Sequence, residues 1–128
     1  MSQDHRTRAQ RQAEDALACV KRVAPADRKE YKGRADGFPV MVLQAGLAQA
    51  VGFMLAKAKD KAGARTPYGR YLDDLAAVIS GVGGEAFQQK VVQAPLPEYR
   101  RLTRETLAVA GWFKRFGQAY LAEKEQRT

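Results

Sequence analysis

The chain has 128 residues, with 22 lysines and arginines against 14 acidic residues, and therefore a formal net charge of +8. This length suits one domain that buries enough surface to fold without a disulfide or a structural metal. Hydrophobic residues make up 45% and charged residues 28% of the chain, which excludes wholesale disorder, and the single Cys19 excludes an internal disulfide.

The composition predicts an all-α protein, because alanine, a strong helix former, occurs 22 times and isoleucine only once. We expect a single compact bundle of about six helices over residues 1–128, with frayed ends at about 1–5 and 124–128. The first residues lack the apolar segment of a signal peptide, and the apolar stretch 38–56 is too rich in small and polar residues to span a membrane. The lone cysteine fits a reducing compartment. The sequence therefore predicts a cytoplasmic protein with no membrane partner.

Hydrophobic periodicity predicts a first helix over about 3–23, ended by Pro25. A short charged helix follows over about 26–35. Proline lacks the amide hydrogen that the first helical turn can spare, so Pro39 predicts the start of a third helix over about 39–59. Apolar residues occur on all sides of this third helix, which is typical of the buried centre of a bundle.

Three further helices are predicted over about 67–80, 85–93 and 97–124, the last being the longest. Thr66 is the expected N-cap of the first of them, with Pro67 at the first helical position. The segment Gly81-Val82-Gly83-Gly84 is expected to end that helix. A phosphate-binding loop is the weaker interpretation, because no lysine occupies the P-loop position and no strand precedes the glycines.

The sequence offers little catalytic chemistry. His5, the only histidine, lies near the terminus, and one histidine with one cysteine cannot form a zinc site of ordinary spacing. Asp73 and Asp74 are adjacent and project about 100° apart on a helix, which favours a solvated face over a shared metal. We expect no catalytic residue, no metal and no cofactor, although the sequence leaves open a nuclease that uses only arginine and tyrosine.

The excess positive charge lies in the two terminal segments. Residues 1–34 carry +4 and residues 95–128 carry +3, whereas residues 35–64 carry +1 and residues 65–94 are neutral. Helical spacing places three arginines of the first helix on one arc, with Asp15 among them, and three of the last helix on a similar arc around Gly111. The candidates for RNA or partner binding are Arg8, Arg11, Arg22, Arg100, Arg104 and Arg115.

Arginine forms two parallel hydrogen bonds to phosphate and also stacks on bases. For any single arginine a solvated helix face is the simpler interpretation, and phosphate contact is indicated only if the two arcs share one surface. Arg101 and Glu105 are expected to pair one turn apart, away from the arc. Trp112, at the rim of the last helix, is interpreted as a core-edge residue rather than as a platform for a base.

The order of these features resembles the small α-helical subunit of the type III-B CRISPR effector, the Cmr complex. The resemblance covers residues 6–121. It depends on the Arg/Gln/Ala-rich first helix, the basic segment with Tyr31-Lys32, the apolar helix with Pro39 and Gly46-Leu47, the Tyr68-Gly-Arg-Tyr71-Leu72 segment, Tyr99 with Thr103 and Thr106-Leu107, and Trp112-Phe113-Lys114-Arg115-Phe116.

The resemblance implies a subunit that is not an enzyme. Such subunits stack with further copies of themselves in a minor filament beside the backbone subunits and, with the large subunit, line the groove for the duplex of crRNA and target RNA. The six arginines come from the helical spacing and not from the family. Two alternatives remain open, namely a pure protein–protein scaffold without RNA contact and a helical RNA-binding adaptor or enzyme outside CRISPR.

Overall fold

The computed structural model describes residues 5–122 of the chain. Within these residues the only β-pairing is an isolated bridge between Lys59 and Arg65, so the predicted all-α fold is confirmed. No helix in the described part is long and apolar enough to cross a membrane. The elements are α1 (Arg8–Lys21), the short 3-10 helix η1 (Pro25–Asp27), α2 (Arg28–Ala45), α3 (Leu47–Ala56), α4 (Pro67–Ser80), α5 (Gly84–Gln93) and α6 (Leu96–Tyr120).

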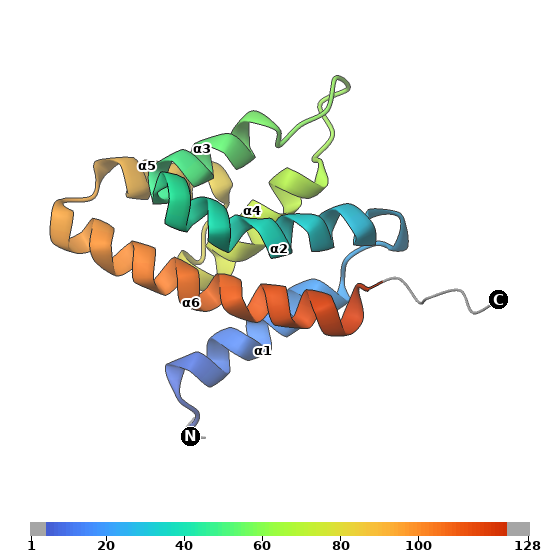
Figure 1. Ribbon diagram of the computed structural model, residues 1–128, viewed down its shortest axis with the longest axis horizontal. Coiled ribbons are helices and arrows are strands. Elements are labelled where there is room, and N and C mark those ends of the chain that lie inside the picture. The colour runs from blue at the N-terminus through green and yellow to red at the C-terminus, as the bar shows by residue number, and fades with distance from the viewer. Residues whose placement is uncertain (1–4, 123–128) are drawn as a thin grey trace.

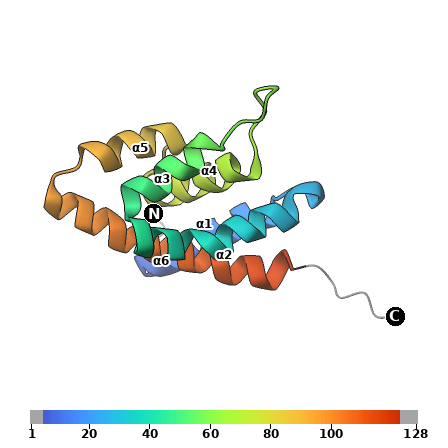
Figure 2. The ribbon, with the colours of Figure 1, turned by 45° about the horizontal axis from the view of Figure 1, so that its top comes forward.

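The longest helix, α6, runs along the molecule between α1 and α2 (Figure 1). Arg8, the first residue of α1, contacts Glu105 in the first half of α6, and the Lys21 ammonium lies 5.0 Å from the centroid of the Tyr120 ring at the end of both helices. These two contacts show that α1 and α6 run in the same direction. Figure 2 shows α3 beside α5, on the side of α2 that faces away from α6, and both α3 and α5 also contact α4.

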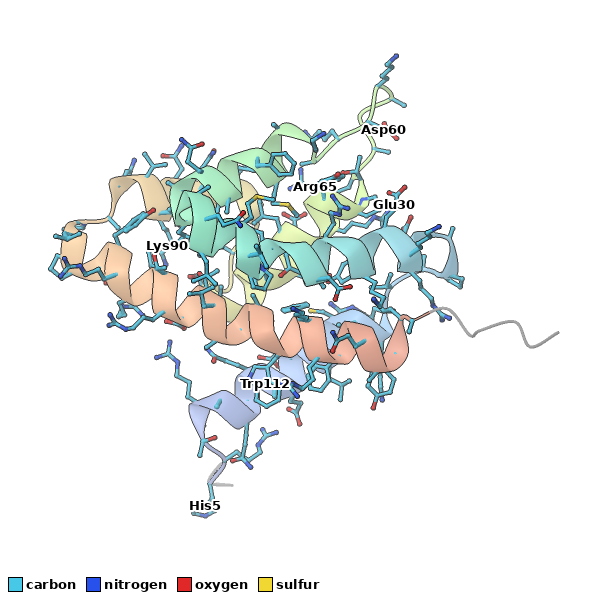
Figure 3. All side chains as sticks on the ribbon, viewed as in Figure 1. His5, Glu30, Asp60, Arg65, Lys90 and Trp112 are labelled. Carbon is cyan, nitrogen blue, oxygen red and sulfur yellow. The ribbon has the colours of Figure 1, made fainter. Side chains whose placement is uncertain are left out.

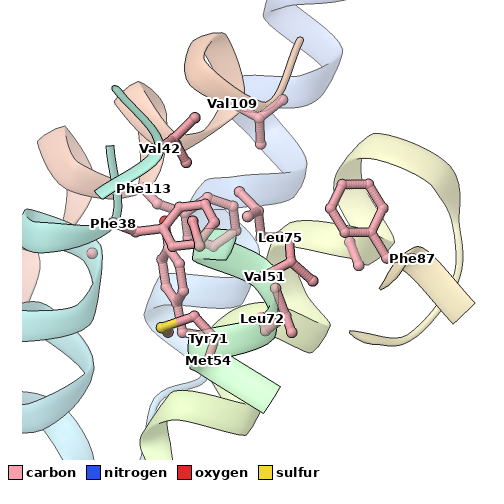
Figure 4. Close-up of a cluster of buried hydrophobic side chains, with 14 of the residues drawn as sticks. Phe38, Val42, Val51, Met54, Tyr71, Leu72, Leu75, Phe87, Val109 and Phe113 are labelled. Atoms are coloured by element: carbon pink, nitrogen blue, oxygen red, sulfur yellow. The ribbon is translucent and has the colours of Figure 1, made fainter. Parts of the chain in front are cut away.

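The core is built around Tyr71 of α4, whose ring is fully buried. Its centroid lies 5.7 Å from that of Tyr31, 5.5 Å from that of Phe38 and 5.6 Å from that of Phe113, all in edge-to-face geometry. Each such pair contributes about 0.5–1.5 kcal/mol beyond the burial of area. Residues from α2, α3, α4, α5 and α6 meet in this cluster (Figure 4), so distant parts of the chain share one core.

The prediction of one central helix over 39–59 is wrong. Pro39 lies inside α2, which runs on to Ala45, and the break falls at Gly46, whose φ of +89° and ψ of 159° separate α2 from α3. This backbone conformation is essentially restricted to glycine. The prediction that this segment is buried on all sides is also wrong, because Leu43 is 72% exposed and Val40, one turn earlier, is exposed as well. Proline is compatible with either position, and only the tertiary contacts on both sides of Gly46 decide.

Local capping sets the remaining boundaries. Thr7 and Gln10 form a capping box in which each side chain accepts a hydrogen bond from the other's backbone amide, so α1 begins at Arg8. Residues 5–7 precede α1 and residues 121–122 follow α6, so the helix predicted over about 3–23 begins too early and the one predicted over about 97–124 extends too far. Most of the residues expected to fray lie outside the described part. Thr66 caps α4 as predicted. Gly81 ends α4 in the left-handed conformation, with φ of +67°.

Candidate nucleic-acid interface

Glu105 joins α6 to α1. Its carboxylate accepts hydrogen bonds from the guanidinium of Arg8, from Nε2 of Gln12 at 3.2 Å and from Nη1 of Arg101 at 2.7 Å. The Glu105 side chain is only 10% exposed, whereas that of Arg8 is 64% exposed. The predicted pair of Arg101 and Glu105 is confirmed, and Arg101 also binds Glu98. Arg8 is therefore held by a carboxylate rather than available to an anion.

Arg11 and Arg22 also have partners within the chain. Nη1 of Arg11 donates to the backbone carbonyl of Arg6 at 2.7 Å, across the N-terminus of α1. Nη2 of Arg22 lies 3.5 Å from Sγ of the buried Cys19. Asp15, expected between these arginines, forms no hydrogen bond or ion pair with any of residues 5–122. The arginines of α1 therefore do not form a free arc.

Arg22 borders a polar cavity of about 190 Å³ between α1, η1, α2 and α4. Inside it the Tyr31 hydroxyl donates to Oδ2 of Asp74 at 2.6 Å. Burial raises the pKa of Asp74, while the Tyr31 hydrogen bond and the positive charge of Arg22 act to lower it. Burial, helped by the Asp74 charge and opposed by Arg22, raises the pKa of the Cys19 thiol to about 11. The cavity therefore holds an unreactive thiol and a desolvated carboxyl rather than a nucleophile with its base.

The prediction that Asp73 and Asp74 form a solvated face is wrong, because both side chains are half-buried and bonded. Asp73 accepts two hydrogen bonds from Arg65, at 2.9 and 2.8 Å, and one from the backbone amide of Gly84 at 2.8 Å. This carboxylate occupies the N-terminus of α5, so the glycine segment before α5 is a helix boundary and not a free phosphate site. The residues described contain no cluster of three or more metal-ligating side chains.

The arginines of α6 differ from those of α1. Arg100, Arg104 and Arg115 are exposed, and none of them forms a hydrogen bond or ion pair with the described part of the chain. Fifteen residues separate the first from the last, which corresponds to about 22 Å along the helix axis. These three residues are called the α6 arginine face below. They present positive charge that the described protein does not itself neutralise.

A shallow depression interrupts this face, lined by Ala108, Gly111, Trp112 and Arg115. A Cβ at Gly111 would meet no atom within 4 Å, so the space is open. Trp112 projects from α6 on the side of α1 (Figure 3) and stacks on Phe116, with centroids 5.6 Å apart and planes at 19°. The open space at Gly111 therefore has an aromatic wall.

The condition set by the sequence, that both arginine arcs share one surface, is not supported by the contacts. Arg8 is directed to α6 by Glu105, whereas Arg22 is directed to the cavity beside α4. Phosphate binding by the α1 arginines would have to displace these partners. The α6 arginine face needs no such exchange, and it remains the part of the prediction that the geometry favours.

Sequence reasoning missed the long-range partners. Arg8 and Glu105 are 97 residues apart, and Tyr31 and Asp74 are 43 residues apart, so no local spacing indicates either contact. The link between Arg65 and Asp73 spans the start of α4. An arginine just before a capped helix and an acid two turns into it are the only signal that could have suggested it.

Comparison with known proteins gives one consistent result. The family model described as "CRISPR-associated protein (Cas_Cmr5)" matches residues 8–120. The protein named "CRISPR system Cmr subunit Cmr5" from Thermus thermophilus is 40% identical over 119 residues, which cover 92% of this chain and 99% of that protein. The crystal structure of a CRISPR-associated Cmr5 family protein from the same organism has a TM-score of 0.79 and 37% identity, over 92% of this chain and 100% of the other.

Proposed function

The chain belongs to the CRISPR-associated Cmr5 family, and from this membership we propose that it is the non-catalytic small subunit of a type III-B CRISPR effector, the Cmr complex. Its partners are the backbone and large subunits, further copies of itself stacked in a minor filament, and the duplex of crRNA and target RNA. Other subunits supply the chemistry. This chain supplies shape and positive charge.

The α6 arginine face carries the RNA part of this proposal. Arg8, Arg65 and Arg101 are each bound to carboxylates of the same chain, so they bring little free charge to a polyanion. The face of α6 keeps three guanidinium groups along one exposed line, unpaired within residues 5–122. Phosphate contacts of this kind are independent of sequence and release counterions, so the affinity falls as the salt concentration rises.

The test replaces Arg100, Arg104 and Arg115 together by glutamate and measures binding of a short RNA duplex at several salt concentrations, in the isolated chain and in the assembled complex. We expect weaker binding and a slope of log K against log salt that is reduced by about 2 to 3, because each phosphate contact contributes about 0.7–0.9. Circular dichroism should be unchanged, since these side chains have no partners in the described chain to lose.

The matched control replaces Arg28, Lys29 and Lys61 by glutamate. These residues are also exposed and form no hydrogen bond or ion pair within residues 5–122. Both variants change the net charge equally, so a loss of binding confined to the α6 variant assigns the effect to position rather than to total charge. Equal losses in both variants, or unchanged binding in the α6 variant, would reject the α6 arginine face as the RNA contact.

A scaffold role without RNA contact is the second candidate, and exposed apolar residues favour it. Val92 and Leu96 flank the connection between α5 and α6 and are 66% and 59% exposed, and Leu43 is exposed one turn before Gly46. The Tyr99 hydroxyl accepts a hydrogen bond from the Ala48 amide at 3.0 Å, so α6 and the Gly46 junction meet at this same end. Absence of any salt-dependent RNA affinity, alone or in the complex, would favour this candidate.

A further inference from the structure

The depression on α6 has features that a phosphate contact alone does not require. Phe116 covers one side of the Trp112 indole. Ala108, one turn earlier on the same helix, offers only a methyl group toward the other side. Gly111 adds no side chain, and Arg115 stands at the rim. The Trp112 side chain is partly buried against the core and lines the depression with its remaining surface, beside a guanidinium group that has no partner among the described residues.

Aromatic rings that are open on one face and flanked by cations are suited to unpaired nucleotides. The base stacks on the ring, and the cation meets the phosphate. A paired base cannot do this, because its faces are already stacked within the duplex. Arg104 lies on the same exposed arc as Arg115, about two turns before Trp112, and could contact a neighbouring phosphate of the same RNA strand.

We propose that the depression formed by Ala108, Gly111, Trp112 and Arg115 binds one unpaired nucleotide of RNA, with its base on the Trp112 indole and its phosphate on Arg115. This inference rests on the proposed function, because it places the site on the α6 arginine face. It adds that this face distinguishes an unpaired nucleotide from a continuous duplex. Trp112 is then a binding residue and not only a residue at the edge of the core.

The chain provides its own probe, since Trp112 is its only tryptophan. Intrinsic tryptophan fluorescence of the full-length protein therefore reports on this one position. The titrants are a single-stranded oligouridylate and a fully paired RNA duplex of the same length. We expect the oligouridylate to quench the Trp112 emission at saturation and the duplex to bind with little quenching.

Gly111→Leu fills the depression while leaving every charge in place. A Cβ at this position has open space, and leucine favours a helix interior more than glycine does, so the variant should fold. We expect its affinity for oligouridylate to fall about tenfold, as expected for the loss of one stacked base, with the duplex affinity unchanged. Ala119→Leu, which adds the same side chain at an exposed position outside the depression, is the control and should behave as the wild type.

Three results would overturn the site: oligouridylate that does not bind, oligouridylate that binds without quenching, and Gly111→Leu with unchanged affinity. Its failure can be distinguished from that of the proposed function. If the glutamate variant of the α6 arginine face loses duplex binding but Gly111→Leu has no effect on oligouridylate, the nucleotide site is rejected and the RNA-contacting face remains. If neither RNA binds in any salt-dependent way, the face is rejected as well.

Discussion

Gly46→Ala tests the break that separates α2 from α3. The glycine has a φ of +89° and a ψ of 159°, a region that a residue with a Cβ adopts only under strain. Alanine must therefore either accept this strain or shift the junction that positions Leu47 and the rest of α3. Both outcomes destabilise the fold.

The magnitude follows from the surroundings of Gly46. An added Cβ would lie 3.6 Å from the Tyr99 hydroxyl, which is an ordinary van der Waals contact, so the penalty arises from the backbone and not from a clash. Strained conformations of this kind cost about 1–3 kcal/mol. The reduced freedom of the unfolded chain returns about 0.4–1 kcal/mol. We therefore expect the free energy of unfolding to fall by about 1–2 kcal/mol and Tm by roughly 5 °C.

Urea and thermal unfolding followed by far-UV circular dichroism measure this change, with Gly37→Ala as the matched control. Gly37 lies inside α2, has open space where a Cβ would stand and does not have a left-handed φ. Alanine at residue 37 should therefore stabilise the helix by up to about 1 kcal/mol. The two substitutions should change stability in opposite directions. If Gly46→Ala is neutral or stabilising, the backbone at residue 46 is helical and a continuous helix over 39–59 is correct.

Two further predictions concern buried carboxylates. The folded pKa of Asp74 is raised above its ordinary 3.8, so its contribution to stability is fully present below pH 3.8 and is lost as the pH rises through the folded pKa. Asp74→Asn can still accept the Tyr31 hydrogen bond and should therefore be more stable than the wild type at neutral pH, as measured by urea unfolding. A stability difference that does not shrink as the pH approaches 3.8 would contradict this. Glu105→Ala removes the carboxylate shared by Arg8, Gln12 and Arg101 and should lower the free energy of unfolding by about 1–2 kcal/mol. The control Glu14→Ala removes only an exposed ion pair with Arg6 and should change the free energy of unfolding by less than about 0.5 kcal/mol. Equal effects of the two substitutions would show that Glu105 does not stabilise the packing of α1 against α6.

The fold class and most of the helices could be read from the sequence, because these depend on local signals. Alanine-rich periodic segments form helices. Thr66 and Pro67 fix the start of α4, and Gly81 fixes its end, through hydrogen bonds and dihedral angles within a few residues. Local spacing also predicted the exposed arc of Arg100, Arg104 and Arg115, since the direction of a side chain around a helix depends on residue number alone.

Which cations are free depends instead on the tertiary contacts. Arg8 and Arg104 look alike in the sequence, yet Glu105, 97 residues from Arg8, neutralises the first, while the second has no partner among residues 5–122. The same holds for Gly46, whose role as a helix break depends on how α2, α3 and Tyr99 of α6 pack around it. An ion pair between distant segments requires the fold to bring two charges within a few ångströms, and no local pattern encodes that approach. The sequence thus gives the total charge of +8, and the packing of α1 against α6 determines which of these positive charges are available to bind a partner.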